Sequence, residues 1–180
     1  MESEQIRKEQ KELWEAAFRG STLSAIMSKH VQYVGFADRR AQGIITINAF
    51  LIPLALAAIN HPHFGAGAPI TILTGLVSII FAVWSLYPKN YASKYGKKNL
   101  FHFSQIGKFS EEEYMKMMRE ATSDNRTLTE MVSRDLYHLS RYVLKPKFAL
   151  LRASYFIFVA GNVTAVLLAC APYLIAPLFA

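Results

Sequence analysis

Charged residues are missing from two long stretches of this 180-residue chain. All 20 Lys and Arg and all 13 Asp and Glu lie in residues 1–40 and 88–152, so residues 41–87 and 153–180 carry no charged side chain. Water-soluble domains of ordinary composition do not leave runs of this length uncharged. A helix needs roughly 20 apolar residues to cross the hydrocarbon core of a bilayer. The pattern therefore predicts an integral membrane protein.

The two uncharged stretches predict three transmembrane helices. Residues 60–69 interrupt the first stretch and are rich in Gly, Pro and Asn, which favour a turn. We therefore expect a hairpin of two spans, over about residues 41–59 and 70–87. The second stretch supplies one further span, in which Pro172 and Pro177 should kink or fray the last third.

The basic residues predict how the chain is oriented. Seven Lys and Arg precede the first span and thirteen lie between the second and third, whereas the hairpin loop and the C-terminal stretch have none. Cytoplasmic loops of membrane proteins collect Lys and Arg. Both charged blocks should therefore be cytoplasmic, while the hairpin tip with His61 and His63 should face outward. The formal net charge of +7 favours attraction to anionic inner-leaflet lipid over binding of a nucleic acid polymer.

The first charged block has the pattern of amphipathic helices. Apolar residues recur at helical spacing over residues 6–18 and again over 26–37. We expect Gly20 to interrupt the helix, and Ser21 and Thr22 to restart it as caps.

The second charged block predicts two further helices. Capping-box signatures at residues 110–113 and 127–130 should open helices over about 110–121 and 127–144. Pro146 should then separate the second of these from the helix that enters the third span. The predicted fold is an all-α integral membrane protein, with three transmembrane helices and a cytoplasmic helical bundle. Its expected parts are residues 1–40, 41–87, 88–152 and 153–180.

The sequence contains no pattern typical of a catalytic or metal site. Metal sites need clustered His, Cys or carboxylate ligands, and the five histidines are scattered along the chain. Gly-rich phosphate loops, nucleophile elbows and kinase-type lysine motifs are absent. The single cysteine, Cys170, lies in the third span and cannot form an intramolecular disulfide. We therefore predict neither an enzyme nor a bound metal or other cofactor.

Three groups of residues in the charged blocks are candidates for binding a ligand. The first group stands at the membrane border of the first span. The second combines an amide, an imidazole and an aromatic ring, and such groups could bond to or stack on a base. The third brings arginines within a turn of an aromatic ring, where a guanidinium fork could hold a phosphate. Anchoring at the lipid headgroups, packing beneath the membrane and a solvated helix face would explain the same residues. The candidates are Asp38 and Arg39; Asn99, Phe101 and His102; and Arg134, Asp135, Tyr137 and Arg141.

Asn48 is the notable polar residue within the predicted spans. An amide in hydrocarbon either finds a partner on another helix or lines a polar path. Pro53, further along the same span, is expected to bend it. Both are candidates for helix association or membrane activity. Small residues such as Gly43, Gly75 and Gly161 would let the spans approach closely.

Several of these segments, taken in order, resemble the transmembrane Pycsar effectors, a family of bacterial antiphage proteins. The resemblance covers about residues 25–165 and depends on the conjunction of the segments around a two-span hairpin. The segments are YVGFADRRA at 33–41, the span with Asn48, NLFHF at 99–103, FSEEEY at 109–114, DLYHLS at 135–140, Lys147 and LLRASY at 150–155.

The resemblance implies a protein of the bacterial inner membrane, which agrees with the multi-pass topology and cytoplasmic N-terminus expected from the basic residues. A companion pyrimidine cyclase, switched on by phage infection, would make cyclic UMP or cyclic CMP. The effector would bind this nucleotide and impair the membrane, which kills or arrests the infected cell. A ligand shifts an assembly only if it binds one state better. We therefore expect the nucleotide to bridge the cytoplasmic helices of neighbouring protomers in a homo-oligomer.

Two alternatives remain open. One is a related two-span effector that answers an oligonucleotide second messenger. The other is a structural membrane module that anchors or oligomerises a partner without sensing a ligand.

Overall fold

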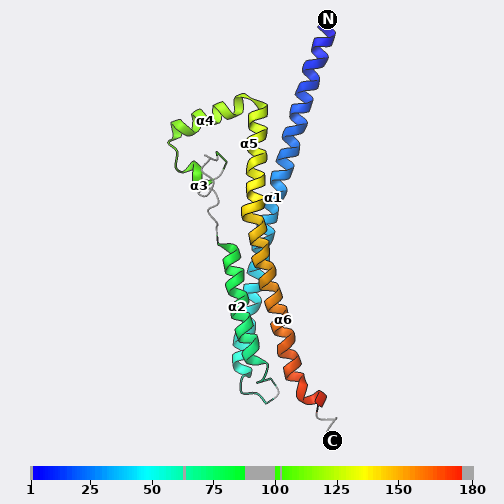
Figure 1. Ribbon diagram of the computed structural model, residues 1–180, viewed down its shortest axis with the longest axis vertical. Coiled ribbons are helices and arrows are strands. Elements are labelled where there is room, and N and C mark those ends of the chain that lie inside the picture. The colour runs from blue at the N-terminus through cyan, green and yellow to red at the C-terminus, as the bar shows by residue number, and fades with distance from the viewer. Residues whose placement is uncertain (1, 63, 88–99, 102, 176–180) are drawn as a thin grey trace. The chain divides into compact units, whose positions relative to one another are not determined.

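The computed structural model describes residues 2–62, 64–87, 100, 101 and 103–175, and all regular structure in these residues is helical (Figure 1). The predicted all-α class is confirmed. The helices are α1 (Glu2–Ala58), α2 (Ala68–Leu86), α3 (Phe103–Ile106), α4 (Glu111–Ser123), α5 (Asn125–His138), the π-helical segment η2 (Leu139–Leu144) and α6 (Lys145–Ile175).

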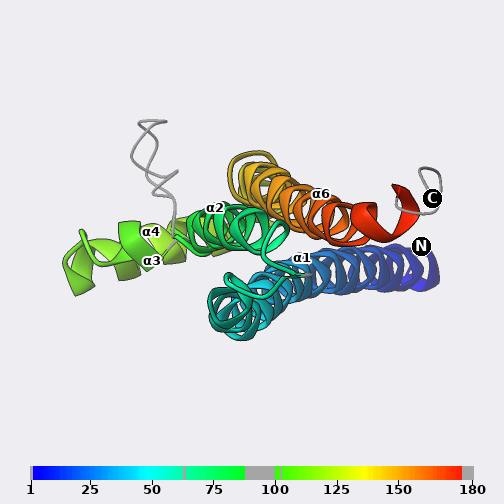
Figure 2. The same ribbon diagram turned by 90° about the horizontal axis from the view of Figure 1, so that it is seen from below.

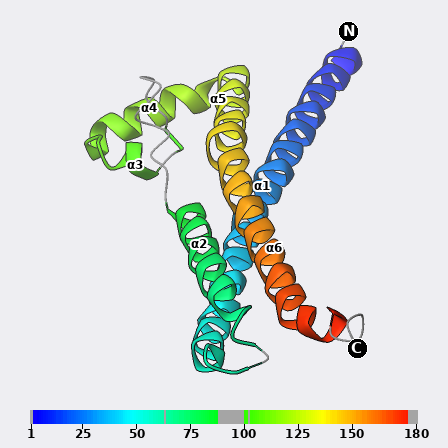
Figure 3. The same ribbon diagram turned by 60° about the horizontal axis from the view of Figure 1, so that its bottom comes forward.

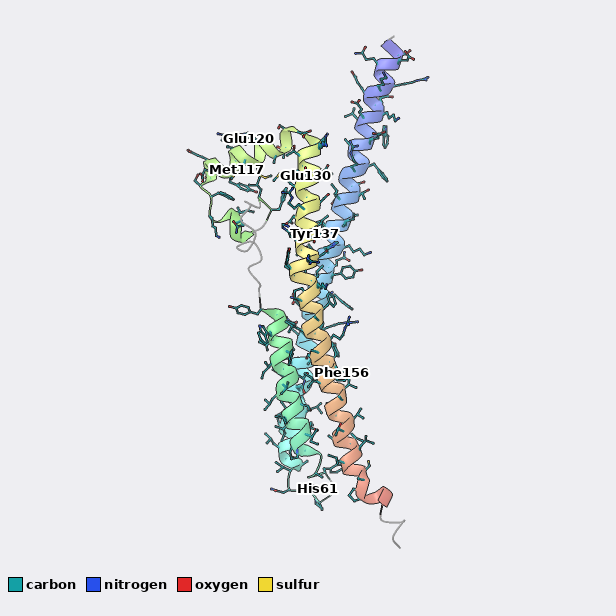
Figure 4. All side chains as sticks on the ribbon, in the orientation of Figure 1. His61, Met117, Glu120, Glu130, Tyr137 and Phe156 are labelled. Carbon is teal, nitrogen blue, oxygen red and sulfur yellow. The ribbon has the colours of Figure 1, made fainter. Side chains whose placement is uncertain are left out.

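The chain divides into two compact units. One comprises Met1–Val34 and Lys89–Leu144, and we call it the charged unit. The other comprises Gly35–Pro88 and Lys145–Ala180, and we call it the membrane unit because it contains both uncharged stretches. Three helices of the described chain are long and apolar enough to cross a membrane, in agreement with the three predicted spans. Large apolar side chains such as Phe50, Leu73 and Phe156 are exposed on these helices, as expected for surfaces that meet lipid. Phe156 is labelled on α6 in Figure 4.

In the membrane unit, α2 packs along α6 (Figure 2). Lipid tails are as apolar as leucine, so helices in a membrane associate through close van der Waals packing and hydrogen bonds instead of the hydrophobic effect. The side of α2 that is buried fits this requirement because it carries only small residues. These residues are Ala68, Gly75, Ser78, Ala82 and Ser85.

Two glycines allow the close approach of these helices. A Cβ atom on Gly161 of α6 would overlap the side chain of Thr74 on α2. A Cβ atom on Gly67, which precedes α2, would stand 2.5 Å from the carbonyl oxygen of Ala165. The first helix completes the bundle, since Ala37, Ala41 and Ile44 of α1 share one buried cluster with Ala82 and Leu151.

The turn between α1 and α2 agrees with the predicted hairpin. The backbone N–H of Gly65 donates to the carbonyl of His61 at 2.8 Å, and α2 begins with a proline in its first turn, where the missing donor costs nothing. His63 lies outside the described residues.

The expected break at Gly20 is wrong, because α1 continues through it. Glycine in a helix interior costs only about 1 kcal/mol relative to alanine. Ser21 and Thr22 do not cap a new helix. Each hydroxyl instead donates to the carbonyl of Phe18, at 2.9 Å in both cases, which keeps these side chains compatible with the helix.

The first predicted capping box is confirmed and the second is wrong. At α4, the Ser110 hydroxyl accepts from the N–H of Glu113 at 3.2 Å, and the Glu113 carboxylate accepts from the N–H of Ser110 at 3.3 Å. Helix α5 begins before the expected cap at Thr127. Asp124 caps it instead, since its carboxylate accepts from the N–H groups of Arg126 and Thr127 at 3.2 and 3.0 Å, and from the Thr127 hydroxyl at 2.7 Å.

This cap predicts a pH-dependent contribution to stability. The Thr127 hydroxyl, followed by the N–H groups of Thr127 and Arg126, lowers the pKa of Asp124 below its ordinary value of 3.8. Because the folded pKa is the lower one, the stabilisation is fully present above about pH 3.8 and is lost as the pH falls through the folded pKa. Asp124→Asn should therefore melt below the wild type near neutral pH, and the difference should vanish in strong acid. Melting temperatures of both proteins across an acid pH series measure it, and a pH-independent difference would contradict the prediction.

The expected separation at Pro146 is also wrong. Helix α5, η2 and α6 follow one another without a gap, and Pro146 is the second residue of α6. Proline has no N–H, and its ring clashes with the carbonyl four residues earlier in an α-helix. The π-helical turn before Pro146 bonds to the fifth residue back and is wider, so it accommodates the ring without ending the helix.

Candidate functional site

An ion pair joins two helices inside the membrane unit. Asp38 of α1 pairs with Lys147 of α6. The side chain of Lys147 is 10% exposed and that of Asp38 is 34% exposed, so much of the pair is removed from water. A buried charge is tolerated only when it is paired, because its desolvation is costly.

The role of Lys147 as the partner of Asp38 was not predicted from the sequence. A signal for the pairing was present, since Asp38 is the one acidic residue between Glu15 and the first span, and Lys147 precedes the third span closely. The adjacent Arg39 is exposed, and Arg40 lies 4.1 Å from the centroid of the Phe36 ring. The predicted ligand contacts of Asp38 and Arg39 stay predictions.

Asn48 lies between α1 and α2. Its side chain is 1% exposed, and its amide nitrogen donates to the carbonyl of Ile44 at 2.9 Å. A Cβ atom on Gly75 would stand 2.8 Å from Asn48 Oδ1, so the absent side chain of Gly75 makes room for the amide. Pro53 is exposed on α1, which remains helical through it. The structure thus places Asn48 at a helix contact and Pro53 on the outer surface of the unit.

Two serines join α2 and α6. The Ser78 hydroxyl lies 3.0 Å from the carbonyl of Ser154, the Ser154 hydroxyl lies 2.8 Å from the carbonyl of Ser78, and the two hydroxyl oxygens are 3.0 Å apart. Both residues are fully buried. This pair was not predicted from the sequence. The signal was the row of small residues at three- and four-residue spacing on α2, which marks a close helix contact in membranes.

The predicted phosphate-binding group on α5 and η2 is only partly brought together. Arg134, Tyr137 and Arg141 are exposed and recur at three- and four-residue spacing, whereas Asp135 is buried. Arg134 donates to the carboxylate of Glu130 at 2.8 Å. Such exposed pairs four residues apart are worth only about 0.3–0.5 kcal/mol. The arginine can therefore exchange this partner for another anion at small cost.

The aromatic group before α3 is described only at Phe101, which is half-buried. Asn99 and His102 lie outside the described residues. Leu100 is buried, and its carbonyl accepts from the Tyr114 hydroxyl of α4 at 3.5 Å. Binding of a base by this segment stays a prediction.

A histidine contact joins α1 to η2 within the charged unit. His30 Nδ1 lies 2.8 Å from the carbonyl of Ile26, and Nε2 lies 2.7 Å from the Ser140 hydroxyl. A carbonyl oxygen only accepts, so Nδ1 carries the hydrogen. In the neutral ring, Nε2 therefore accepts from Ser140. Across the residues that the structure describes, no group of three or more His, Cys, Asp and Glu could hold a metal ion.

The fold and these contacts define an integral membrane protein in which a helical hairpin and a third span pack through small and polar residues. A family model for the Pycsar effector protein domain matches residues 22–175, and the chain belongs to this family of transmembrane effectors. The expected family is confirmed, and the chain is accordingly a membrane effector of antiphage Pycsar defence. No curated protein and no solved structure matches the chain.

Proposed function

We propose that this effector binds cyclic UMP or cyclic CMP made by a companion pyrimidine cyclase during phage infection. The bound effector then impairs the bacterial inner membrane, and the infected cell dies or stops growing before phage matures. The observation that carries the proposal is membership of the Pycsar effector family over residues 22–175. The Lys and Arg bias of residues 1–40 and 88–152 supports a cytoplasmic location for both blocks, where the nucleotide is made.

We propose that self-association connects nucleotide binding to membrane damage. The N-terminal part of α1 exposes Leu13, Trp14 and Phe18 to 70%, 77% and 73%. Residues 2–21 contain four basic and five acidic side chains. Helices that lie on anionic lipid are rich in Lys and Arg, whereas this segment carries basic and acidic residues in nearly equal number. The mixed charge therefore favours packing of the exposed Leu13, Trp14 and Phe18 against a second copy of the chain over packing against lipid. A nucleotide that binds the assembled state better would drive the equilibrium toward it.

The membrane unit supplies polar groups for the damaging step. Asn48, Ser78 and Ser154 are buried between the spans. When the spans separate or reorient, these groups would face either lipid, which is costly, or a water-filled path. Assembly of several protomers would favour the second outcome, because their polar groups could line a shared path.

Liposomes loaded with a dye test the proposed function. The purified chain should release the dye when cyclic UMP or cyclic CMP is added, and linear UMP and CMP should give only the background rate. In cells, the chain together with its cyclase should stop phage growth, and the chain alone should not. Equal release with cyclic and linear nucleotides would contradict direct gating. Release only with a cyclic oligonucleotide would favour the alternative class of effector.

A further inference from the structure

A cleft of about 590 Å³ lies between α1 and α5 in the charged unit. Its α1 side contains a row of small residues at four-residue spacing, namely Ala16, Gly20, Ser24 and Ser28. This row hollows the helix surface. The two helices separate toward the N-terminal end of α1 (Figure 3). Further along in the C-terminal direction of both helices, the bond between His30 and Ser140 joins α1 to η2. The cleft is therefore wedge-shaped. It is open toward the N-terminal end of α1, and its two walls are joined by a hydrogen bond beyond the other end.

The walls of the cleft combine apolar surface with a few polar groups. Leu23 and Met27 of α1 face Leu128 and Val132 of α5 across it. Pockets that enclose small molecules have volumes of roughly 300–1,000 Å³, are mostly apolar and carry a few convergent polar groups. Volume and chemistry of this cleft both fall within that description.

The open end of the cleft favours an anion. Arg19 lines it and is the one charged residue among the described residues that line the cleft. The one ion pair that Arg19 makes in the described chain is with Glu15, at 4.0 Å, and both side chains are more than half exposed. An exposed pair at this distance is weak, so the guanidinium can turn to a ligand.

We propose that this cleft binds the cyclic pyrimidine mononucleotide, an inference that rests on the proposed function. Arg19 holds the single phosphate charge, and the apolar walls pack on the base and ribose. Hydroxyls of Ser24, Ser28 and Thr129 bond the polar edge of the base. Of the predicted ligand-binding residues that the structure describes, none lines this cleft. A nucleotide seated in the wedge contacts both helices at once, so binding changes the energy of their separation and can bias the assembly.

Two substitutions test the cleft in the full chain purified in detergent. A Cβ atom on Gly20 meets nothing within 4 Å, so Gly20→Leu places a bulky side chain on the cleft wall with no clash at its Cβ. Arg19→Gln removes the positive charge of the cleft. Titration calorimetry with cyclic UMP and with cyclic CMP should show binding weakened by about tenfold or more in each variant. The matched controls are Gly43→Leu, at another open glycine of α1, and Arg126→Gln, beside the cleft but not lining it. Both should bind as the wild type does.

The outcomes separate this inference from the proposed function. If the wild type binds a cyclic pyrimidine nucleotide and Gly20→Leu binds it equally well, the cleft is not the site, and the proposed function stands. If the wild type binds no cyclic mononucleotide, both the proposed direct sensing of the nucleotide and the proposed binding site are wrong. Hydrogen exchange of the wild type needs no variant. Added nucleotide should slow exchange in residues 16–31 and 125–132, and protection confined to other segments would overturn the proposal.

Discussion

Lys147→Met should lower the free energy of unfolding by about 2–3 kcal/mol, because it leaves the Asp38 carboxylate without its cation. The cost should be smaller than for a fully buried pair, since a third of the Asp38 side chain is exposed. Thermal unfolding in detergent, followed by circular dichroism, measures the loss. The matched control is Lys145→Met, which removes an exposed lysine from the same helix and should change little.

A double variant separates loss of the ion pair from loss of packing. Asp38→Asn combined with Lys147→Met removes both charges, so most of the stability should return. The coupling between the two substitutions is the difference between their joint effect and the sum of their separate effects. If the double variant is as unstable as that sum, the pair does not hold α1 to α6.

Gly161→Ala should separate α2 from α6 and cost about 1–3 kcal/mol, the usual range for overpacking a close contact. The new Cβ atom would overlap the side chain of Thr74, including the Cβ atom of Thr74. A rotamer change does not move that atom, so it cannot relieve the clash. Phage protection should fall with stability, and both are measured on the same variant. Gly43→Ala is the control, because a Cβ there meets nothing within 4 Å.

The clash can be confirmed by making room for the added methyl group. In a Thr74→Gly background, Gly161→Ala should cost little or nothing, since the atoms that it would strike are gone. A cost that remains equal in both backgrounds would show that Thr74 is not what Gly161 accommodates.

The spans were predictable because charge and length act locally. An uncharged stretch of sufficient length must either cross a bilayer or be covered by protein, and the turn-forming residues between 60 and 69 divide the first stretch into two. The Ser110 cap was predictable for a similar reason, since both partners of the box lie within four residues. The family followed from the order of several such local segments.

The remaining features depend on competition or on distant partners. Asp124 and Thr127 can both cap a helix, and the structure uses the carboxylate because it accepts three bonds there, including one from Thr127 itself. Pro146 is a helix breaker by local rules, but a wider turn before it absorbs the ring. The pairing of Asp38 with Lys147 joins residues more than a hundred positions apart, so the sequence signals it only through the position of each residue near the start of a span.

Under the proposed function, the paired serines bear on why the effector leaves an uninfected cell unharmed. Each hydroxyl reaches the other residue's backbone, so a small slide of α2 along α6 disturbs both contacts together. Each such bond in a membrane is worth only about 1–2 kcal/mol at most, but their joint loss sets a threshold for movement. If the effector impairs the membrane as proposed, fluctuations below this threshold would leave the spans packed, and an uninfected cell that carries the effector would keep its membrane intact.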